Sequence, residues 1–140
     1  MLFRSRAHAQ AKLGAYANAI SDCENAIKLK ADLGEAYNNL AWILATCPLA
    51  KYRDGKRALA EATVACKLSL WKDPISLDTF AAACAQAGDF TGAVKWEQEA
   101  LAQPGLSPGD SADAQKRLAL YQAHKTYQEV PQTSSASAAN

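Results

Sequence analysis

The sequence has almost no net charge and no long hydrophobic run. Its 140 residues carry 15 Lys and Arg against 14 Asp and Glu, so the formal net charge is +1. A chain this close to neutrality has no global field that attracts nucleic acid, and we expect no nucleic-acid partner. No stretch of about 18 apolar residues occurs, so we expect no membrane insertion. The first residues also lack the apolar core of a signal peptide, which favours a cytoplasmic location.

Residues that carry chemistry are scarce as well. The two histidines are His8 and His124, and the chain has no H-E-x-x-H, G-x-S-x-G, phosphate-loop or G-x-G-x-x-G motif. Its four cysteines form no C-x-x-C or Cys/His pattern, which predicts reduced core residues rather than disulfides or metal ligands. They are Cys23, Cys47, Cys66 and Cys84. We therefore expect no enzyme, no catalytic residue, no cofactor and no metal.

Alanine is abundant instead. The chain has 31 alanines, and alanine combines the highest helix propensity with a very small side chain. Hydrophobic residues make up 49% and charged residues 21%, as in ordinary globular proteins. This composition favours closely packed helices over a β-sandwich or barrel, and the length favours one domain.

Two segments repeat one pattern. One segment begins at Gly14 and the other at Gly88. In each, the glycine is followed by an aromatic residue two positions later, by an alanine five positions later and by a second alanine twelve positions later. A degenerate middle copy at Gly55 keeps the alanine pair. The alanine pairs fall at 19/26, 58/65 and 93/100. Residues seven apart share a helix face, so these small side chains allow a second helix to approach closely.

The pattern resembles the tetratricopeptide repeat (TPR), whose period is about 34 residues. The stretches NNLAWILATCP at 38–48 and YRDGK at 52–56 resemble a bacterial subgroup of that family. The resemblance implies an all-α fold, namely a right-handed α-solenoid of three helical hairpins with a C-terminal capping helix. It also implies a scaffold that binds a protein or peptide in a concave groove.

The repeats, their helices and the tail have predicted bounds. We expect a TPR domain over 1–129, with repeats at about 1–33, 34–73 and 74–106, a capping helix at about 108–123, and a disordered tail at 130–140. The expected helices span 2–13, 15–30, 35–46, 55–69, 74–87, 90–102 and 108–123. On the capping helix we expect Leu118 and Tyr121 to face the repeats and Lys116, Arg117 and Gln122 to face water. We also expect Glu97 and Glu99 on a solvated surface.

The resemblance places the peptide site on the first helix of each hairpin, on the face away from the second helix. The expected site residues are Arg4, His8 and Lys12 in repeat one, Asn38, Asn39 and Trp42 in repeat two, and Asp78 and Thr79 in repeat three. Asparagine amides can bond an extended backbone, and tryptophan can serve as an anchor. Alternatively, Trp42 packs between neighbouring first helices. The cations Arg4 and Lys12 favour an extended, mildly acidic or apolar segment.

A second function class stays open. The first expected helix begins almost at Met1 without a preceding cap, and an uncapped repeat end exposes apolar surface. That face would be covered by pairing, which gives a homodimer and a self-association module, or by preceding repeats, which makes the chain a C-terminal accessory domain of a larger protein.

Overall fold

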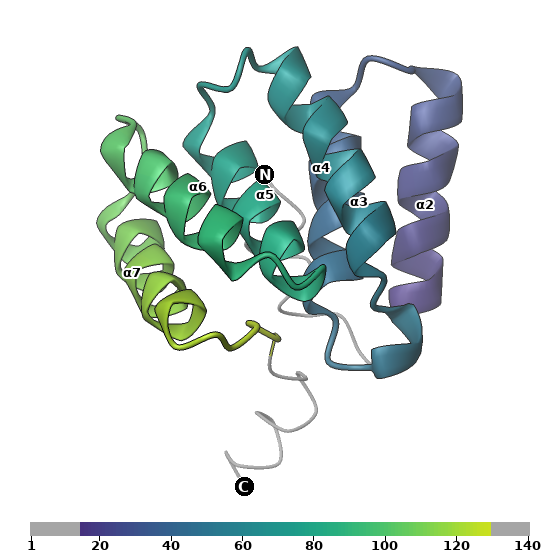
Figure 1. The fold of residues 1–140 in the computed structure, drawn as a ribbon. Helices are drawn as coiled ribbons and strands as arrows, with labels where there is room; N and C mark the ends of the chain where they lie inside the picture. The colour runs from purple at the N-terminus through teal and green to yellow at the C-terminus, as the bar shows by residue number, and fades with distance from the viewer. Residues whose placement is uncertain (1–14, 130–140) are drawn as a thin grey trace, which may run out of the picture.

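The computed structural model describes residues 15–129, and the described part is helical (Figure 1). The helices are α2 (Ala15–Leu29), α3 (Gly34–Thr46), the short 3₁₀ helix η2 (Ala50–Tyr52), α4 (Gly55–Leu68), α5 (Pro74–Gln86), α6 (Phe90–Ala102) and α7 (Pro108–Gln122). Residues 15–129 contain no strand, which confirms the all-α prediction. The expected helix at 2–13 and the expected disordered tail at 130–140 lie outside the described residues.

Local capping explains where four of the helices begin. An N-cap side chain accepts a hydrogen bond from a free N–H of the first turn and so replaces the missing intrahelical partner. The caps of α4, α5, α6 and α7 are Asp54, Asp73, Asp89 and Ser107. Helices α5 and α7 also have proline in the first turn, where its missing N–H costs nothing. Because such signals are local, both boundaries of each predicted helix from residue 15 onward lie within one residue of the observed boundaries.

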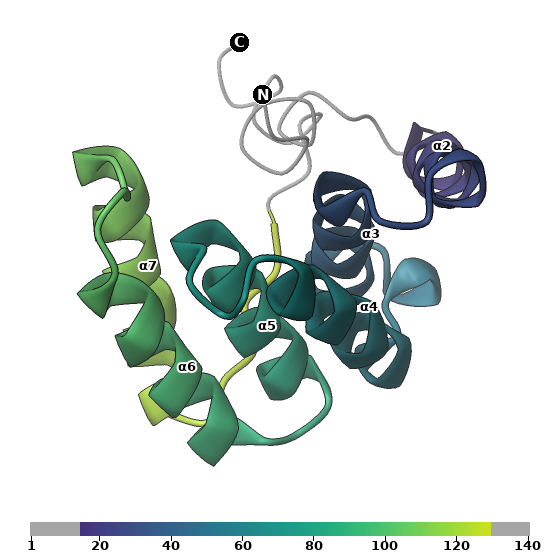
Figure 2. The same ribbon diagram turned by 90° about the horizontal axis from the view of Figure 1, so that it is seen from above.

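Consecutive helices pack against each other, and α3 also packs against α5 (Figures 1 and 2). Alanine allows the close approach: Ala58 of α4 and Ala93 of α6 are fully buried. The start of α4 is closer still to the end of α5. A Cβ added at Gly55 would lie 2.7 Å from the backbone of Gln86 and Ala87, so only glycine fits there without movement.

Two charged side chains that were expected in water are buried, and that prediction is wrong. Arg117 of α7 is 5% exposed and Glu97 of α6 is fully buried, whereas Glu99 is exposed as predicted. The reason is a tertiary ion pair, in which Arg117 reaches Asp78 of α5. Tyr121 is buried and Lys116 and Gln122 are exposed, as predicted, whereas Leu118 is half-buried and Leu120 is the α7 leucine that packs against the core.

After α7 the chain runs back across the molecule without regular structure. The stretch from Ala123 to Glu129 passes along α5 toward α3 (yellow in Figure 2). Its side chain Tyr127 packs against two core clusters, one centred on α3 and α4 and the other on α5 and α6. We call residues 123–129 the return segment.

Candidate functional site

The first helices of the expected second and third hairpins are α3 and α5, and burial divides their shared face into two halves. In one half the side chains are closed off from solvent: Trp42 and Asp78 are each 1% exposed, and Thr79 is fully buried. The return segment covers this half. The ring centroid of Tyr127 lies 5.9 Å from that of Trp42, and the Glu129 N–H donates to the Thr46 carbonyl oxygen at 2.8 Å.

Arg117 fixes α7 to the same closed half. Its Nε and one terminal nitrogen donate to the two carboxylate oxygens of Asp78 at 3.1 and 2.9 Å, and Nε lies 3.7 Å from Glu97. The guanidinium also stacks near two rings, 5.2 Å from the centroid of Trp42 and 5.1 Å from that of Tyr127. Such a bidentate, desolvated contact is among the stronger polar interactions in proteins. Trp42 and Asp78 therefore serve this internal contact in the structure.

The charge of Arg117 is maintained by its neighbours. Burial by itself would lower the pKa of Arg117, but the negative charges of Asp78 and Glu97 and the hydrogen bonds to Asp78 raise it above its ordinary value. The guanidinium is thus a permanent cation. The carboxylates and the two rings form one connected network with it across α3, α5, α6, α7 and the return segment.

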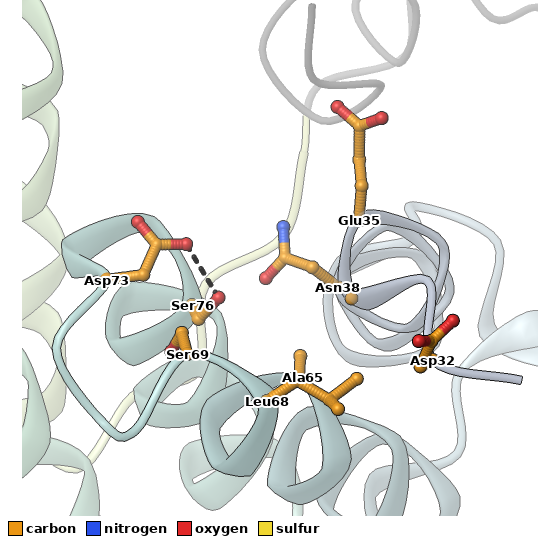
Figure 3. Close-up of a pocket in the computed structure, with 9 residues that line it drawn as sticks. Asp32, Glu35, Asn38, Ala65, Leu68, Ser69, Asp73 and Ser76 are labelled. Carbon is orange, nitrogen blue, oxygen red and sulfur yellow. Dashed lines mark hydrogen bonds between the residues drawn. The ribbon is translucent and has the colours of Figure 1, made fainter.

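The other half of the face is open and forms a pocket of about 250 Å³ between the starts of α3 and α5 and the end of α4 (Figure 3). The lining residues are Asp32, Gly34, Glu35, Asn38, Ala65, Leu68, Ser69, Asp73 and Ser76. The end of α4 supplies the apolar part, and the two loops and helix starts supply the polar part.

Asn38 is the unusual member of this pocket. Its side chain is 2% exposed, yet among the described residues neither Oδ1 nor Nδ2 has a hydrogen-bond partner. Buried polar groups are almost always bonded, and leaving one unbonded costs about 1–3 kcal/mol. In Figure 3 the amide points from α3 into the pocket. The amide is therefore positioned to bond a group that enters there.

The acidic residues that line the pocket form no ion pair within the described part of the chain. Asp73 is held by the hydrogen bonds that it accepts, from the Ile75 N–H at 3.2 Å and the Ser76 hydroxyl at 2.8 Å. Asp32 and Glu35 are exposed, and among the described residues neither forms an ion pair. The described residues that line the pocket include three acidic residues and no Lys or Arg, so its rim is negative.

The structure brings together only part of the predicted site. Asn38 lies in the open pocket, Trp42, Asp78 and Thr79 lie in the closed half, and Asn39 is half-buried and does not line the pocket. The predicted residues Arg4, His8 and Lys12 lie outside the described residues. Sequence reasoning missed Asp32, Ser69, Asp73 and Ser76 as pocket residues. The capping signal does locate Asp73, but nothing local to the sequence indicates that the end of α4 meets the start of α5 here.

The cysteines are free and buried, as the sequence predicts. Burial raises the pKa of Cys23 to about 11 and the pKa values of Cys66 and Cys84 to about 12. These thiols are therefore protonated at neutral pH and are poor nucleophiles. Within residues 15–129 no three His, Cys, Asp or Glu side chains are grouped so that they could hold a metal ion.

The described helices are also too short or too polar for a transmembrane span.

No protein-family model matches the chain, and no curated protein and no solved structure is significantly similar to it.

Proposed function

We propose that the chain is a non-catalytic scaffold that binds an extended protein or peptide segment on the open half of the α3–α5 face. We further propose that its hairpins are TPR-like repeats stacked as a right-handed α-solenoid, with α7 as the cap. The packing of α3 on both α4 and α5 supports this arrangement, because successive first helices of a solenoid touch each other as well as their own second helices.

The observation that carries the binding proposal is the buried, unbonded amide of Asn38. An amide side chain offers one acceptor and two donors, so it can bond the N–H and C=O of an extended backbone together. A pocket of about 250 Å³ holds one side chain of the segment rather than a whole small-molecule ligand. The closed half, with its packed rings, supplies a rigid wall beside it.

The proposal is tested by amide correlation spectra of isotope-labelled protein, titrated with octapeptides of sequence Gly-Ala-Ser-X-Ser-Ala-Gly-Gly, with X varied over Lys, Arg, norleucine, Gln and Glu. We expect at least one peptide to shift the side-chain amide signals of Asn38 and the backbone signals of Glu35 and Ser76. The Asn38→Ala variant should lose this binding, since hot-spot truncations cost at least about 2 kcal/mol.

The matched control is Asn25→Ala, which removes an exposed asparagine from α2 and should bind like wild type. If no peptide of the set shifts Asn38, or if the shifts cluster on α6 and α7 instead, the proposal is wrong.

A further inference from the structure

We propose that the pocket at Asn38 selects a cationic side chain, lysine or arginine, of the bound segment; this inference rests on the proposed function and specifies its ligand. The charge of the pocket lining favours a cation. Three acidic residues, Asp32, Glu35 and Asp73, are among the described residues that line the pocket, and no Lys or Arg is among them. Among the described residues none of the three forms an ion pair that would neutralise it.

The helix dipoles act in the opposite direction and are weaker. The pocket lies at the starts of α3 and α5, and each helix start carries roughly half a positive charge. Asp73 already caps α5, and Glu35 lies in the first turn of α3. Three full negative charges against about two half charges leave the pocket negative. An anionic side chain would therefore be repelled.

The hydrogen-bonding capacity of the lining also favours a cation. The Ser76 hydroxyl donates to Asp73, and the Ser69 hydroxyl donates to the Cys66 carbonyl oxygen at 3.1 Å. Both serine protons are thus in use, and what the two hydroxyls still offer is lone pairs. With the carboxylates and Asn38 Oδ1, the pocket is rich in acceptors. A lysine ammonium has three donors and no acceptor, and a guanidinium has five, so both match it.

The pocket also offers a surface for the apolar part of a long side chain. Ala65 and Leu68 form an apolar side of the pocket, against which the methylene groups of a long side chain can lie while its charged end reaches the acceptors. Asn38 Nδ2 is then left to donate to a backbone carbonyl of the segment. This preference for a cationic segment differs from the sequence-based expectation of a mildly acidic or apolar segment. That expectation came from Arg4 and Lys12, which lie outside the described part of the chain.

The test compares the octapeptide affinities by the same titration, at low and at physiological salt. We expect the Lys and Arg peptides to bind at least about tenfold more tightly than the norleucine peptide, and the Glu peptide to bind more weakly still. The Lys preference should shrink with added salt, because the rim carboxylates are exposed. The double variant Asp32→Asn/Glu35→Gln should reduce the preference to about threefold or less.

Asp73 is left intact in this variant because it caps α5, and the control Asp113→Asn, on the exposed side of α7, should keep the full preference. If the Lys, norleucine and Glu peptides all shift Asn38 with similar affinities, the cation preference is refuted while the peptide site stands. If n-butylammonium alone binds as tightly as the Lys peptide, the pocket recognises a free amine and the inference about a segment is refuted. If no peptide shifts Asn38, the proposed function itself fails.

Discussion

Replacing Arg117 by methionine should strongly destabilise the protein. Arg117 is 5% exposed and donates two hydrogen bonds to Asp78, which is 1% exposed. Methionine keeps much of the side-chain length and its packing against Trp42 and Tyr127. The substitution therefore removes the charge and its hydrogen bonds while it opens little space. What is left behind is the buried negative charge of Asp78 and Glu97.

The expected loss follows from the burial of the pair. Removing one partner of a buried ion pair costs about 3–5 kcal/mol, whereas an exposed pair contributes at most about 1 kcal/mol. The free energy of unfolding of a domain is about 5–15 kcal/mol in total. Arg117→Met should thus remove about a fifth or more of the stability and lower Tm by about 10–20 °C.

The assay is urea unfolding followed by far-UV circular dichroism. Lys116→Met is the matched control, because it makes the same change at the exposed neighbouring position and should alter stability by less than about 0.5 kcal/mol. Adding Asp78→Asn to Arg117→Met should restore part of the loss, since it removes one buried negative charge. A loss below about 1 kcal/mol for Arg117→Met would show that the buried network does not hold α7 in place.

Three further predictions use the same unfolding assay. Ala58→Leu should cost about 1–3 kcal/mol because Ala58 is fully buried between helices, whereas Ala60→Leu on the exposed side of α4 should be close to neutral; equal losses would contradict the packing. Gly55→Ala should destabilise, since the new Cβ would lie 2.7 Å from the backbone at the end of α5, whereas Gly109→Ala, whose Cβ would meet only Ser107 Oγ at 4.0 Å, should not; a neutral Gly55→Ala would refute the close approach. Burial raises the pKa of the Cys66 thiol from its ordinary value of 9.0 to about 12. The native state therefore keeps this proton to a higher pH than the unfolded chain does. The contribution of this thiol to the free energy of unfolding should be constant below about pH 8 and should fall by about 1 kcal/mol by about pH 10. Cys66→Ala should reduce the fall, and a stability that rises over this interval would contradict the assignment.

How much the sequence could predict depends on the range of the interactions involved. The helix ends were predictable because their signals are local, as with the cap Asp73 and the following Pro74. The burial of the repeated alanines on α4 and α6 followed from their spacing on one helix face, whereas Ala19 and Ala26 of α2 are half-buried. The burial of Arg117 was not predictable in this way, because its partner Asp78 lies on a different helix. Helix periodicity indicates only contacts between residues three or four positions apart.

The candidate site shows the same limit. The sequence correctly places Asn38 and Trp42 on α3, but it does not show that the return segment brings Tyr127 onto Trp42 and leaves Asn38 in the open half. That division depends on the path of the chain after α7. A stretch of seven residues with one half-buried tyrosine carries no periodic pattern from which its path could be predicted.

The central claim is that a cationic side chain of an extended segment enters the pocket at Asn38. It is tested most directly by an isotope-filtered NOE spectrum of labelled protein with the unlabelled Lys octapeptide. The account predicts NOEs between the lysine ε-methylene protons and the side-chain amide protons of Asn38, together with NOEs from the lysine methylene groups to the Leu68 methyl groups. NOEs that connect the lysine to other surfaces, with none to Asn38 or Leu68, would contradict it.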